Sequence, residues 1–314
     1  MKELSGLRVL LWGFSGAGFP GGDGAREAER ELTALGLPTV YTHAKDPDVG
    51  DKLAQRYDVA IVTNTRIGEL LQADARLWSS ADQTALWFWD LRPGHVGAPL
   101  RGLVDRVFLS YNGPWRSPAG DVYDPAQWAA ALGCPVGYAP QASPCRDTVA
   151  IPDAPRVVFV GDVANKTYHR GRAELCKALG ARVVNAKQRA DRLRVEASLP
   201  GLYSSSRYVL STSPRAPGYT SVRTYSIIAC GGLMLLQRFP GCDRLFRDGE
   251  HVVTFDSAAD LLPRLAELDA QPETRARIAT AGRQLQRERH TVTSRVLSIC
   301  SEMVGKTGGF SGWL

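Results

Sequence analysis

The sequence lacks paired cysteines, long apolar runs and a leader-like start, and each absence excludes a class of protein. Its six cysteines, at positions 134, 145, 176, 230, 242 and 300, include no C-x-x-C pair. That pattern argues against a zinc site or a disulfide framework and is typical of a reducing compartment. No apolar run approaches the roughly 18 residues of a membrane-spanning helix, and MKELSG at the start lacks the apolar core of a signal peptide. We therefore expect a soluble cytoplasmic protein with no membrane partner.

The composition is that of a globular chain with a local excess of positive charge. Apolar residues make up 44% and charged residues 22% of the 314 residues, which excludes disorder, collagen and coiled coil. The length predicts two domains. The net charge of +6 is concentrated in residues 156–194, which hold ten Lys or Arg against three Asp or Glu. This stretch is either a solvated helical face or a surface for the phosphates of a nucleotide or a nucleic acid.

Short apolar runs alternate with amphipathic stretches in the first half of the chain. These runs are rich in Val, Leu and aromatic residues and are too short for buried helices. Strands are predicted at 7–12, 39–42, 59–63, 85–89 and 104–110, and helices at 25–35, 51–57 and 67–73. This alternation predicts an α/β fold with a parallel sheet covered on both faces.

A second series of the same kind follows the proline-bearing segment 138–155. It predicts strands at 156–160, 182–185, 208–212, 232–237 and 251–255, and helices at 172–179, 260–268 and 273–289. We therefore predict an N-terminal domain over 1–145 and a C-terminal domain over 146–314, with the option that the extreme C-terminus packs back on the first. Two Rossmann-like halves would leave a cleft lined by the carboxyl ends of both sheets, where ligands bind in open α/β folds.

The first loop contains a literal G-x-G-x-x-G over residues 16–21. Three features argue against a dinucleotide fingerprint. The loop is long, Pro20 interrupts the expected start of a helix, and the second strand ends in Thr42-His43 without an acid for a ribose. We instead expect a flexible loop in which Gly18, Gly21 and Gly22 let the backbone approach a ligand on the acceptor side.

A second motif, SVRTYSIIACGG, spans residues 221–232. It predicts a loop, then an apolar helix ended by a glycine pair, then a buried strand. Ser221 and Arg223 lie at the junction of the loop and the helix. A hydroxyl, a guanidinium and free backbone N–H groups at such a junction favour phosphate binding.

These residues resemble a known family. S-V-R-x-Y-x-x-x-A-C-G-G at 221–232 and L-F-x-D-G-E-x-V-V-T-F-D-S at 245–257 are similar to the C-terminal domain of group-1-type glycosyltransferases, in particular the subgroup first described in spore-protein maturation. Segments 202–210 and 271–295 resemble the family in the same order, so the resemblance covers about residues 155–300. It implies a GT-B fold, in which two Rossmann-like parallel-sheet domains face a central cleft. A nucleotide sugar would be bound mainly by the second domain and the acceptor mainly by the first.

The resemblance assigns donor-binding roles to Ser221, Arg223, Tyr225 and Ser226, with one departure from the family pattern. Where the family has a glutamate that contacts the nucleotide ribose, this chain has Ser226. A serine hydroxyl makes a shorter and weaker contact than a carboxylate. This departure has three interpretations: a neighbouring residue makes the ribose contact instead, the donor differs from the usual ones, or the protein has lost activity.

The segment after the predicted strand 156–160 carries a glycine and several basic residues. In the family this position supplies both to the donor diphosphate, whose departure develops negative charge. The candidates are Gly161, Lys166, Arg170 and Arg172, with some of the cations expected to be surface charges only. His169 is a weaker candidate.

An aromatic strand ends in Asp90, followed by a proline turn with His95. A carboxylate at the carboxyl end of a strand would face the cleft, where it could act as general base on an acceptor hydroxyl. The alternative is that Asp90 caps the next turn. Asp23 and His95 are competing bases, and Trp115 with Arg116 would stack on a sugar or a base on the acceptor side.

The sequence therefore predicts a nucleotide-sugar-dependent glycosyltransferase, with no cofactor beyond its co-substrate and no metal, because basic loops of this fold can replace one. The acceptor stays open between a hydroxylated base in duplex DNA, as in phage-type DNA glycosyltransferases, and a saccharide, a protein or a small molecule. A phage-encoded enzyme would work in the host cytoplasm. A non-catalytic nucleotide-sugar or nucleic-acid binding protein is the alternative of another class, and a monomer or small homo-oligomer is expected. DNA phosphates would contact Arg182, Lys187, Arg189, Arg192 and Arg194.

Overall fold

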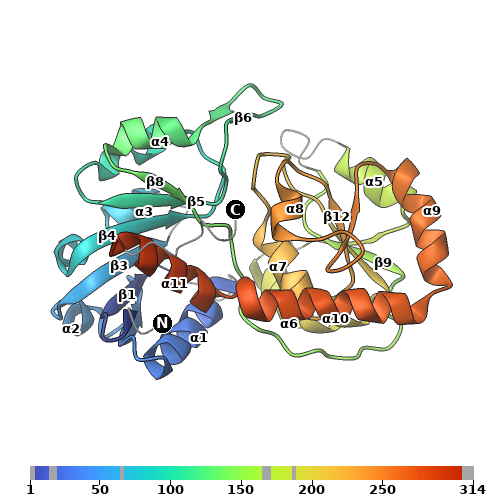
Figure 1. Ribbon diagram of the computed structural model, residues 1–314, viewed down its shortest axis with the longest axis horizontal. Coiled ribbons are helices and arrows are strands. Elements are labelled where there is room, and N and C mark those ends of the chain that lie inside the picture. The colour runs from blue at the N-terminus through green and yellow to red at the C-terminus, as the bar shows by residue number, and fades with distance from the viewer. Residues whose placement is uncertain (1–3, 14–19, 64–66, 165–170, 186–188, 306–314) are drawn as a thin grey trace. The chain divides into compact units, whose positions relative to one another are not determined.

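The chain forms two compact units, each built on its own parallel sheet (Figure 1). The computed structural model describes residues 4–13, 20–63, 67–164, 171–185 and 189–305, with the side chains of 20–23, 189–194 and 196 left out. The first unit comprises Met1–Arg116, Gly120–Gln141 and Val292–Leu314, and the second comprises Ser117–Ala119 and Ala142–Thr291. No helix among the described residues is long and apolar enough to cross a membrane.

The sheet of the first unit has the strand order β2-β1-β3-β4-β5-β8, and every pairing is parallel. The strands are β1 (Val9–Trp12), β2 (Thr39–Thr42), β3 (Tyr57–Thr63), β4 (Ala81–Phe88), β5 (Arg106–Leu109) and β8 (Val136–Tyr138). The prediction of a parallel α/β sheet is thus confirmed. Sequence patterns missed β8 because three residues, V-G-Y, give no detectable alternation.

Helices cover both faces of this sheet. They are α1 (Pro20–Ala34), α2 (Val49–Leu53), α3 (Ile67–Leu71), α4 (Pro125–Leu132) and α11 (Val292–Met303), with 3₁₀ turns η2 (Ala75–Ser79) and η3 (Gly94–Leu100). The C-terminal helix α11 packs against α1, β3 and β4. Its Arg295 is fully buried and donates from Nε to the carbonyl of Pro140 at 3.0 Å. The last described helix therefore completes the first unit.

The expectation about Pro20 was wrong. Helix α1 begins at Pro20 rather than near Ala25. Proline has no N–H to donate and its fixed φ suits a helix, so the first helical position accepts it readily. Residues 14–19 of the glycine loop lie outside the described residues.

The sheet of the second unit has the order β10-β9-β11-β12-β13, also parallel throughout. Its strands are β9 (Val157–Val160), β10 (Arg182–Val184), β11 (Tyr208–Ser211), β12 (Met234–Gln237) and β13 (Val253–Phe255). The helices are α5 (Arg172–Ala178), α6 (Arg189–Ser205), α7 (Val222–Ala229), α8 (Cys242–Leu245), α9 (Ala258–Asp269) and α10 (Pro272–Arg289). The second unit thus repeats the Rossmann-like plan of the first.

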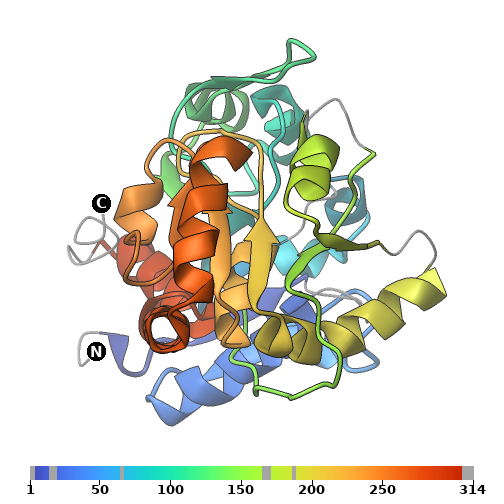
Figure 2. The same cartoon turned by 90° about the vertical axis from the view of Figure 1, so that its right-hand side faces the viewer.

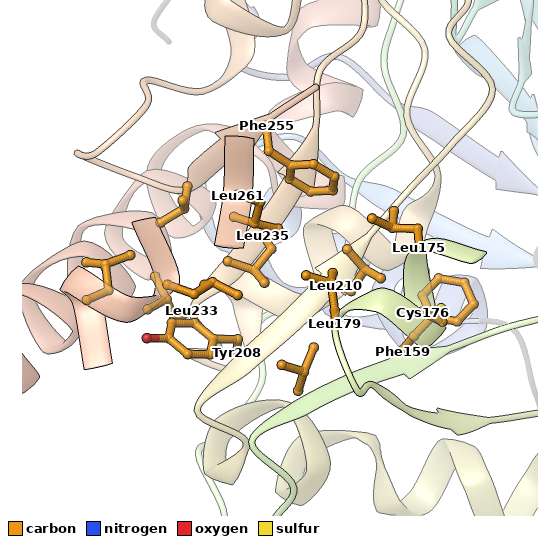
Figure 3. Close-up of a cluster of buried hydrophobic side chains, with 14 of the residues drawn as sticks. Phe159, Leu175, Cys176, Leu179, Tyr208, Leu210, Leu233, Leu235, Phe255 and Leu261 are labelled. Atoms are coloured by element: carbon orange, nitrogen blue, oxygen red, sulfur yellow. The ribbon is translucent and has the colours of Figure 1, made fainter. Parts of the chain in front are cut away.

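Alternating strand residues build two cores on the two faces of this sheet, as the two-residue period of a strand requires. On one face Phe159, Leu210 and Leu235 pack against α5 and α9 (Figure 3). On the other face Val209 and Met234 pack against α6, α7 and α8. Figure 2 shows the second unit from the side of α9, which lies in front of part of the sheet. Because both faces are covered, the carboxyl and amino edges of the sheet are where ligands can reach it.

The strand order reverses direction once in each sheet. In the first unit the chain moves from β1 to β2 on one side and to β3 on the other; in the second it moves from β9 to β10 and to β11. Such switch points leave a crevice at the carboxyl edge, since the connections on either side lead to opposite faces. The crevices lie after β1 and β3 in one unit, and after β9 and β11 in the other.

Glycine is required at position 13, directly after β1, because two segments of the chain pass close to each other there. Its φ is +103°, and a Cβ there would lie 2.1 Å from the carbonyl oxygen of Thr63. Gly6 has a similar φ of +85° but open space around its Cβ position. We expect Gly6→Ala to cost about 1 kcal/mol of unfolding free energy from backbone strain. Gly13→Ala should cost about 1–3 kcal/mol more from the steric contact.

Urea unfolding of both variants measures the difference. Gly6→Ala is the matched control, since the two substitutions share a left-handed backbone and differ in the neighbouring carbonyl. Equal losses in both variants would mean that the contact at Thr63 relaxes at no cost.

Candidate functional site

The best-defined site of the second unit is the switch point between β9 and β11. Gly161 follows β9 with a φ of +145°, and Thr212 follows β11. A Cβ on Gly161 would lie 2.7 Å from Nη1 of Arg223. Glycine is needed here because the backbone passes directly against a guanidinium group.

Arg172, in the first turn of α5, is one of two arginines at this point. It is 5% exposed. Its Nε donates to the Thr212 hydroxyl at 2.8 Å, Nη2 to the Thr212 carbonyl at 3.1 Å, and Nη1 to the Asp162 carbonyl at 2.8 Å. The guanidinium also lies over the ring of Phe159, 5.2 Å from its centroid. Arg172 therefore ties the ends of β9 and β11 together.

Arg223, in the first turn of α7, approaches the same two strand ends. It donates from Nη1 to the carbonyl of Val160 at 2.9 Å and from Nη2 to the carbonyl of Thr212 at 2.6 Å. Its carbon Cζ lies 4.8 Å from the centroid of the Phe159 ring. Its Nε is buried and has no hydrogen-bond partner among the described residues. One N–H of this guanidinium is thus left for a further acceptor.

The two guanidinium groups put positive charge into a poorly solvated place. Burial, and then repulsion from Arg223, lower the pKa of Arg172 to about 9. Burial also lowers the pKa of Arg223. A lowered pKa means that the charged form is held at a cost. An anion at this point would relieve that cost, which is the electrostatic condition for a phosphate site.

Hydroxyl groups surround the same strand end, and sequence reasoning named one of them, Ser221. Its Oγ is buried without a hydrogen-bond partner among the described residues. Thr224 accepts or donates to Ser211 at 2.8 Å and also bonds Thr220. Ser213 accepts from the backbone N–H of Ser221 at 3.2 Å. The run S-T-S at 211–213, where the buried strand β11 ends, was the signal that would have found this cluster.

Tyr225 and Ser226 turn into the interior rather than toward the switch point. Tyr225 is fully buried, with ring centroids 5.9 Å from Phe246 and 5.1 Å from His290. Ser226 is 8% exposed, and its Oγ lies 3.2 Å from the Oγ of Ser143. The donor-binding roles of both residues stay predictions. In this structure they anchor α7.

Several predicted cations fall outside the described residues. Lys166, His169, Arg170 and Lys187 lie in segments that the structure leaves out, as does Gly18. The exposed Arg182 opens β10. The remaining arginines of the proposed DNA-contacting run lie in α6, where their side chains are not described: Arg189, Arg192 and Arg194.

Asp90 follows β4 by two residues and is half-buried. Burial raises the pKa of its carboxyl group, and Arg92 partly offsets this. The carboxylate makes no hydrogen bond or salt bridge with any residue that the structure describes, so it does not cap the next turn there. A carboxylate that is partly desolvated and uncommitted is the condition for a general base.

The other first-unit candidates are more scattered. His95 is exposed in η3. Asp23, with Gly21 and Gly22, lies in the first turn of α1, where only the backbone is described. Trp115 and Arg116 form strand β6 (Trp115–Arg116) of a hairpin with β7 (Val122–Tyr123). In that hairpin the Trp115 ring packs 5.3 Å from Tyr123, and Arg116 donates to the Gly120 carbonyl at 3.0 Å.

A cavity of about 590 Å³ opens at the carboxyl edge of β12 and β13, on the same edge as the arginine pair. Arg215 and Arg238 line it, and both are paired with Asp256, at 3.1 and 3.6 Å. Sequence reasoning missed this cavity, because ion pairs between residues 18 and 41 positions apart leave no local pattern.

One D-x-D pair, Asp46 and Asp48, follows β2. Asp46 is already bonded to Lys52 at 2.7 Å and accepts the backbone N–H of Asp48 at 3.2 Å. These bonds hold the pKa of Asp46 below its usual value against the opposing effect of burial. The pair stabilises the turn that leads into α2.

Comparison with known proteins identifies the fold of the chain and the family that its second half matches. Residues 154–301 match the family described as glycosyl transferase-like. No curated protein is significantly similar to the chain in sequence. HepE from Anabaena in complex with UDP superposes with a TM-score of 0.56 at 13% identity, over 95% of this chain and 100% of that one.

Two further solved structures share the fold. An α-glucosyltransferase in complex with UDP and a 13-mer DNA containing an HMU base has a TM-score of 0.59 at 10% identity, over 96% of this chain and 100% of that one. Sucrose-phosphate synthase from Thermosynechococcus elongatus has a TM-score of 0.57 at 13% identity, over 95% of this chain and 98% of that one.

The two parallel α/β units are those of the GT-B fold. Most of the second unit, together with the first residues of α11, matches the glycosyl transferase-like family.

Arg223 offers a test of the switch point. Removing the guanidinium takes one donor from the carbonyl of Val160 and one from that of Thr212, which keeps Arg172 as a donor. We therefore expect Arg223→Ala to lower the unfolding free energy by about 1–3 kcal/mol. Loss of one charge-assisted contact should also weaken nucleoside-diphosphate binding about ten- to a hundred-fold. The structure thus adds a stability cost that the sequence did not indicate.

Urea unfolding and calorimetric titration of UDP, below the unfolding midpoint of the variant, separate the two effects. Arg247→Ala is the control, because that side chain is 72% exposed and pairs with an exposed glutamate. Unchanged UDP affinity in folded Arg223→Ala would remove the anion site from this edge.

Proposed function

We propose that the chain transfers a sugar from a nucleotide-sugar donor to an acceptor hydroxyl, and that Arg223 and Arg172 attract the donor diphosphate. One observation carries this proposal: the half-buried Arg223 has a buried Nε–H without a partner among the described residues, beside the buried Arg172 at a switch point. UDP in the HepE and α-glucosyltransferase complexes supports a uridine nucleotide as the first donor to test.

The chemistry at the reacting atoms is a substitution at the anomeric carbon. A bond forms from the acceptor oxygen to that carbon, and the bond from the carbon to the diphosphate oxygen breaks. The acceptor proton passes to the carboxylate of Asp90, and the electron pair of the broken bond leaves with the nucleoside diphosphate. Fixed cations lower this barrier because they stabilise the developing charge without reorganising.

We further propose that the arginine pair takes the place of a metal ion in this step. Two guanidinium groups near one strand end already provide the charge that a divalent cation would bring. Turnover should then survive an excess of chelator. Loss of turnover in chelator, restored by one divalent metal, would show that the cations are insufficient.

We propose a hydroxylated base in duplex DNA as the acceptor. The net charge of +6 favours a polyanionic partner, and the α-glucosyltransferase bound to UDP and HMU-containing DNA has the same fold. Sucrose-phosphate synthase shares that fold as well, so the acceptor has to be decided by experiment. A saccharide, protein or small-molecule acceptor is the other outcome.

Asp90→Asn tests the general base. Loss of the proton acceptor should lower turnover about 10²–10⁴-fold, with donor affinity unchanged because donor contacts are assigned to the second unit. Since burial raises the pKa of Asp90, the folded state carries the charged carboxylate at a cost. At neutral pH the asparagine variant should therefore be as stable as the wild type or more stable.

The pH dependence gives a second signature. A base must be deprotonated, so wild-type turnover should fall as pH decreases through the raised pKa of Asp90, at a higher pH than for an exposed aspartate. Asp82→Asn, at the exposed amino end of the same strand, is the control and should leave rate and profile unchanged. Full turnover in Asp90→Asn would move the base to Asp23 or His95.

Binding of duplex DNA tests the acceptor. If phosphates contact Arg189 and Arg192, affinity should fall by about 0.9 log unit per log unit of salt for each phosphate neutralised. Arg189→Glu with Arg192→Glu should then abolish the mobility shift and spare UDP binding. No shift of an HMU-containing duplex at low salt would remove DNA. Absence of UDP-sugar hydrolysis despite UDP binding would favour a non-catalytic binding protein.

A further inference from the structure

The second unit has another cavity, at the opposite edge of its sheet from the switch point. It measures about 480 Å³ and is lined by residues that precede β11 and β12, by Thr148 and by one face of α10. We call it the α10 cavity. Ser206 and Arg207 lie directly before β11, and Gly231 to Leu233 lie directly before β12. The cavity thus belongs to the amino edge, whereas the donor site belongs to the carboxyl edge.

The lining is strongly cationic. Along α10, residues 275, 279, 283 and 287 recur every four positions and share one face, and three of them are arginines. With Arg207, four arginines line the cavity, and no aspartate or glutamate is among the described lining residues. Nearby like charges repel one another, so a buried or bound anion would stabilise this arrangement.

The four arginines differ in how far their charge is already balanced. Arg207 is paired with Asp269 at 3.0 Å. Arg275 donates to the carbonyl of Asp269 at 2.9 Å, and Arg283 donates from Nη2 to the carbonyl of Arg146 at 2.7 Å. Arg287 is exposed and makes no hydrogen bond with any described residue. Three of the four therefore bring uncompensated charge to the cavity.

Two buried donors in the lining also lack partners among the described residues. They are the hydroxyl of Ser206, a residue 5% exposed, and Nε of Arg283. Unsatisfied buried polar groups are rare and call for a ligand, an ion or water. Thr148 and Thr280 add hydroxyls to the same lining. Arginines with hydroxyl donors are the groups that recognise phosphate oxygens.

We propose that the α10 cavity binds the phosphate or diphosphate group of a phosphorylated small molecule, separately from the donor site. The volume favours a small molecule, since pockets of about 300–1,000 Å³ hold ligands of drug-like size. The arginine charges and the hydroxyl groups of the lining favour a phosphate ester as the ligand. This inference does not depend on the nature of the donor or the acceptor.

Pyrophosphate is the probe, titrated calorimetrically into the full chain at 0.15 M salt with UDP at saturation and again without UDP. Arg287→Gln, which removes an exposed charge, should weaken the UDP-insensitive binding about tenfold. Arg283→Gln with Arg287→Gln should weaken it about a hundredfold. Arg277→Gln is the matched control, because that arginine lies on the same helix outside the cavity and should change affinity less than twofold.

Ser206→Ala distinguishes a ligand contact from a folding effect. Removing a hydroxyl that has no partner within the described part of the chain should not lower the melting temperature, whereas pyrophosphate affinity should fall about three- to tenfold. Comparing the α10 variants without UDP keeps the outcome independent of the donor assignment.

Three results would overturn the proposal. One is the absence of UDP-insensitive pyrophosphate binding in the folded wild type. Another is equal weakening by Arg277→Gln and Arg287→Gln, which would reduce the effect to net charge. The third is binding of a 13-mer duplex, but not pyrophosphate, that is lost in the double variant, which would make the face a nucleic-acid surface.

Discussion

The guanidinium groups of Arg172 and Arg223 join the ends of β9 and β11, and the geometry and charge of this end of the second unit depend on them. They donate to backbone carbonyls at the ends of both strands, so charged groups fix the geometry of the switch point. The same bonds that fix the strand ends place positive charge where an anion can approach. Structure and recognition are therefore coupled: each arginine that would bind a phosphate also satisfies carbonyl oxygens that the loop leaves without partners.

The apolar layers on the two faces of the second sheet leave its two edges as the places where charged groups can stay solvated or meet a ligand. With both faces of the second sheet covered by helices, uncompensated polar groups gather at its two edges. The carboxyl edge carries Arg172 and Arg223, and the amino edge carries the arginines of α10. Beyond the carboxyl and amino ends of the strands, backbone N–H and C=O groups have no partner in the hydrogen-bond ladder. Side chains or ligands have to supply those partners.

Sequence patterns predicted the element order well, because short apolar strands between amphipathic helices are a local signal. They found Gly161, Arg172, Ser221 and Arg223, which the structure brings to one strand end. They did not show that Tyr225 points into the core or that Ser226 meets Ser143, 83 positions away. Nor did they show the α10 cavity. Burial and long-range pairing depend on how distant segments pack, and no window of sequence contains that.

The return of α11 to the first unit has a consequence for any attempt to divide the chain. The first unit is not a continuous stretch: it is completed by Val292–Leu314, after the chain has built the second. A fragment ending at Gln141 would lack the helix that packs on β3 and β4, and the carbonyl of Pro140 would lose the Arg295 donor. A single protease cut near residue 142 would likewise leave both units joined through residues 291 and 292. After such a cut, residues 1–141 would be a separate covalent piece, held to the rest of the first unit by the packing of α11 on α1, β3 and β4.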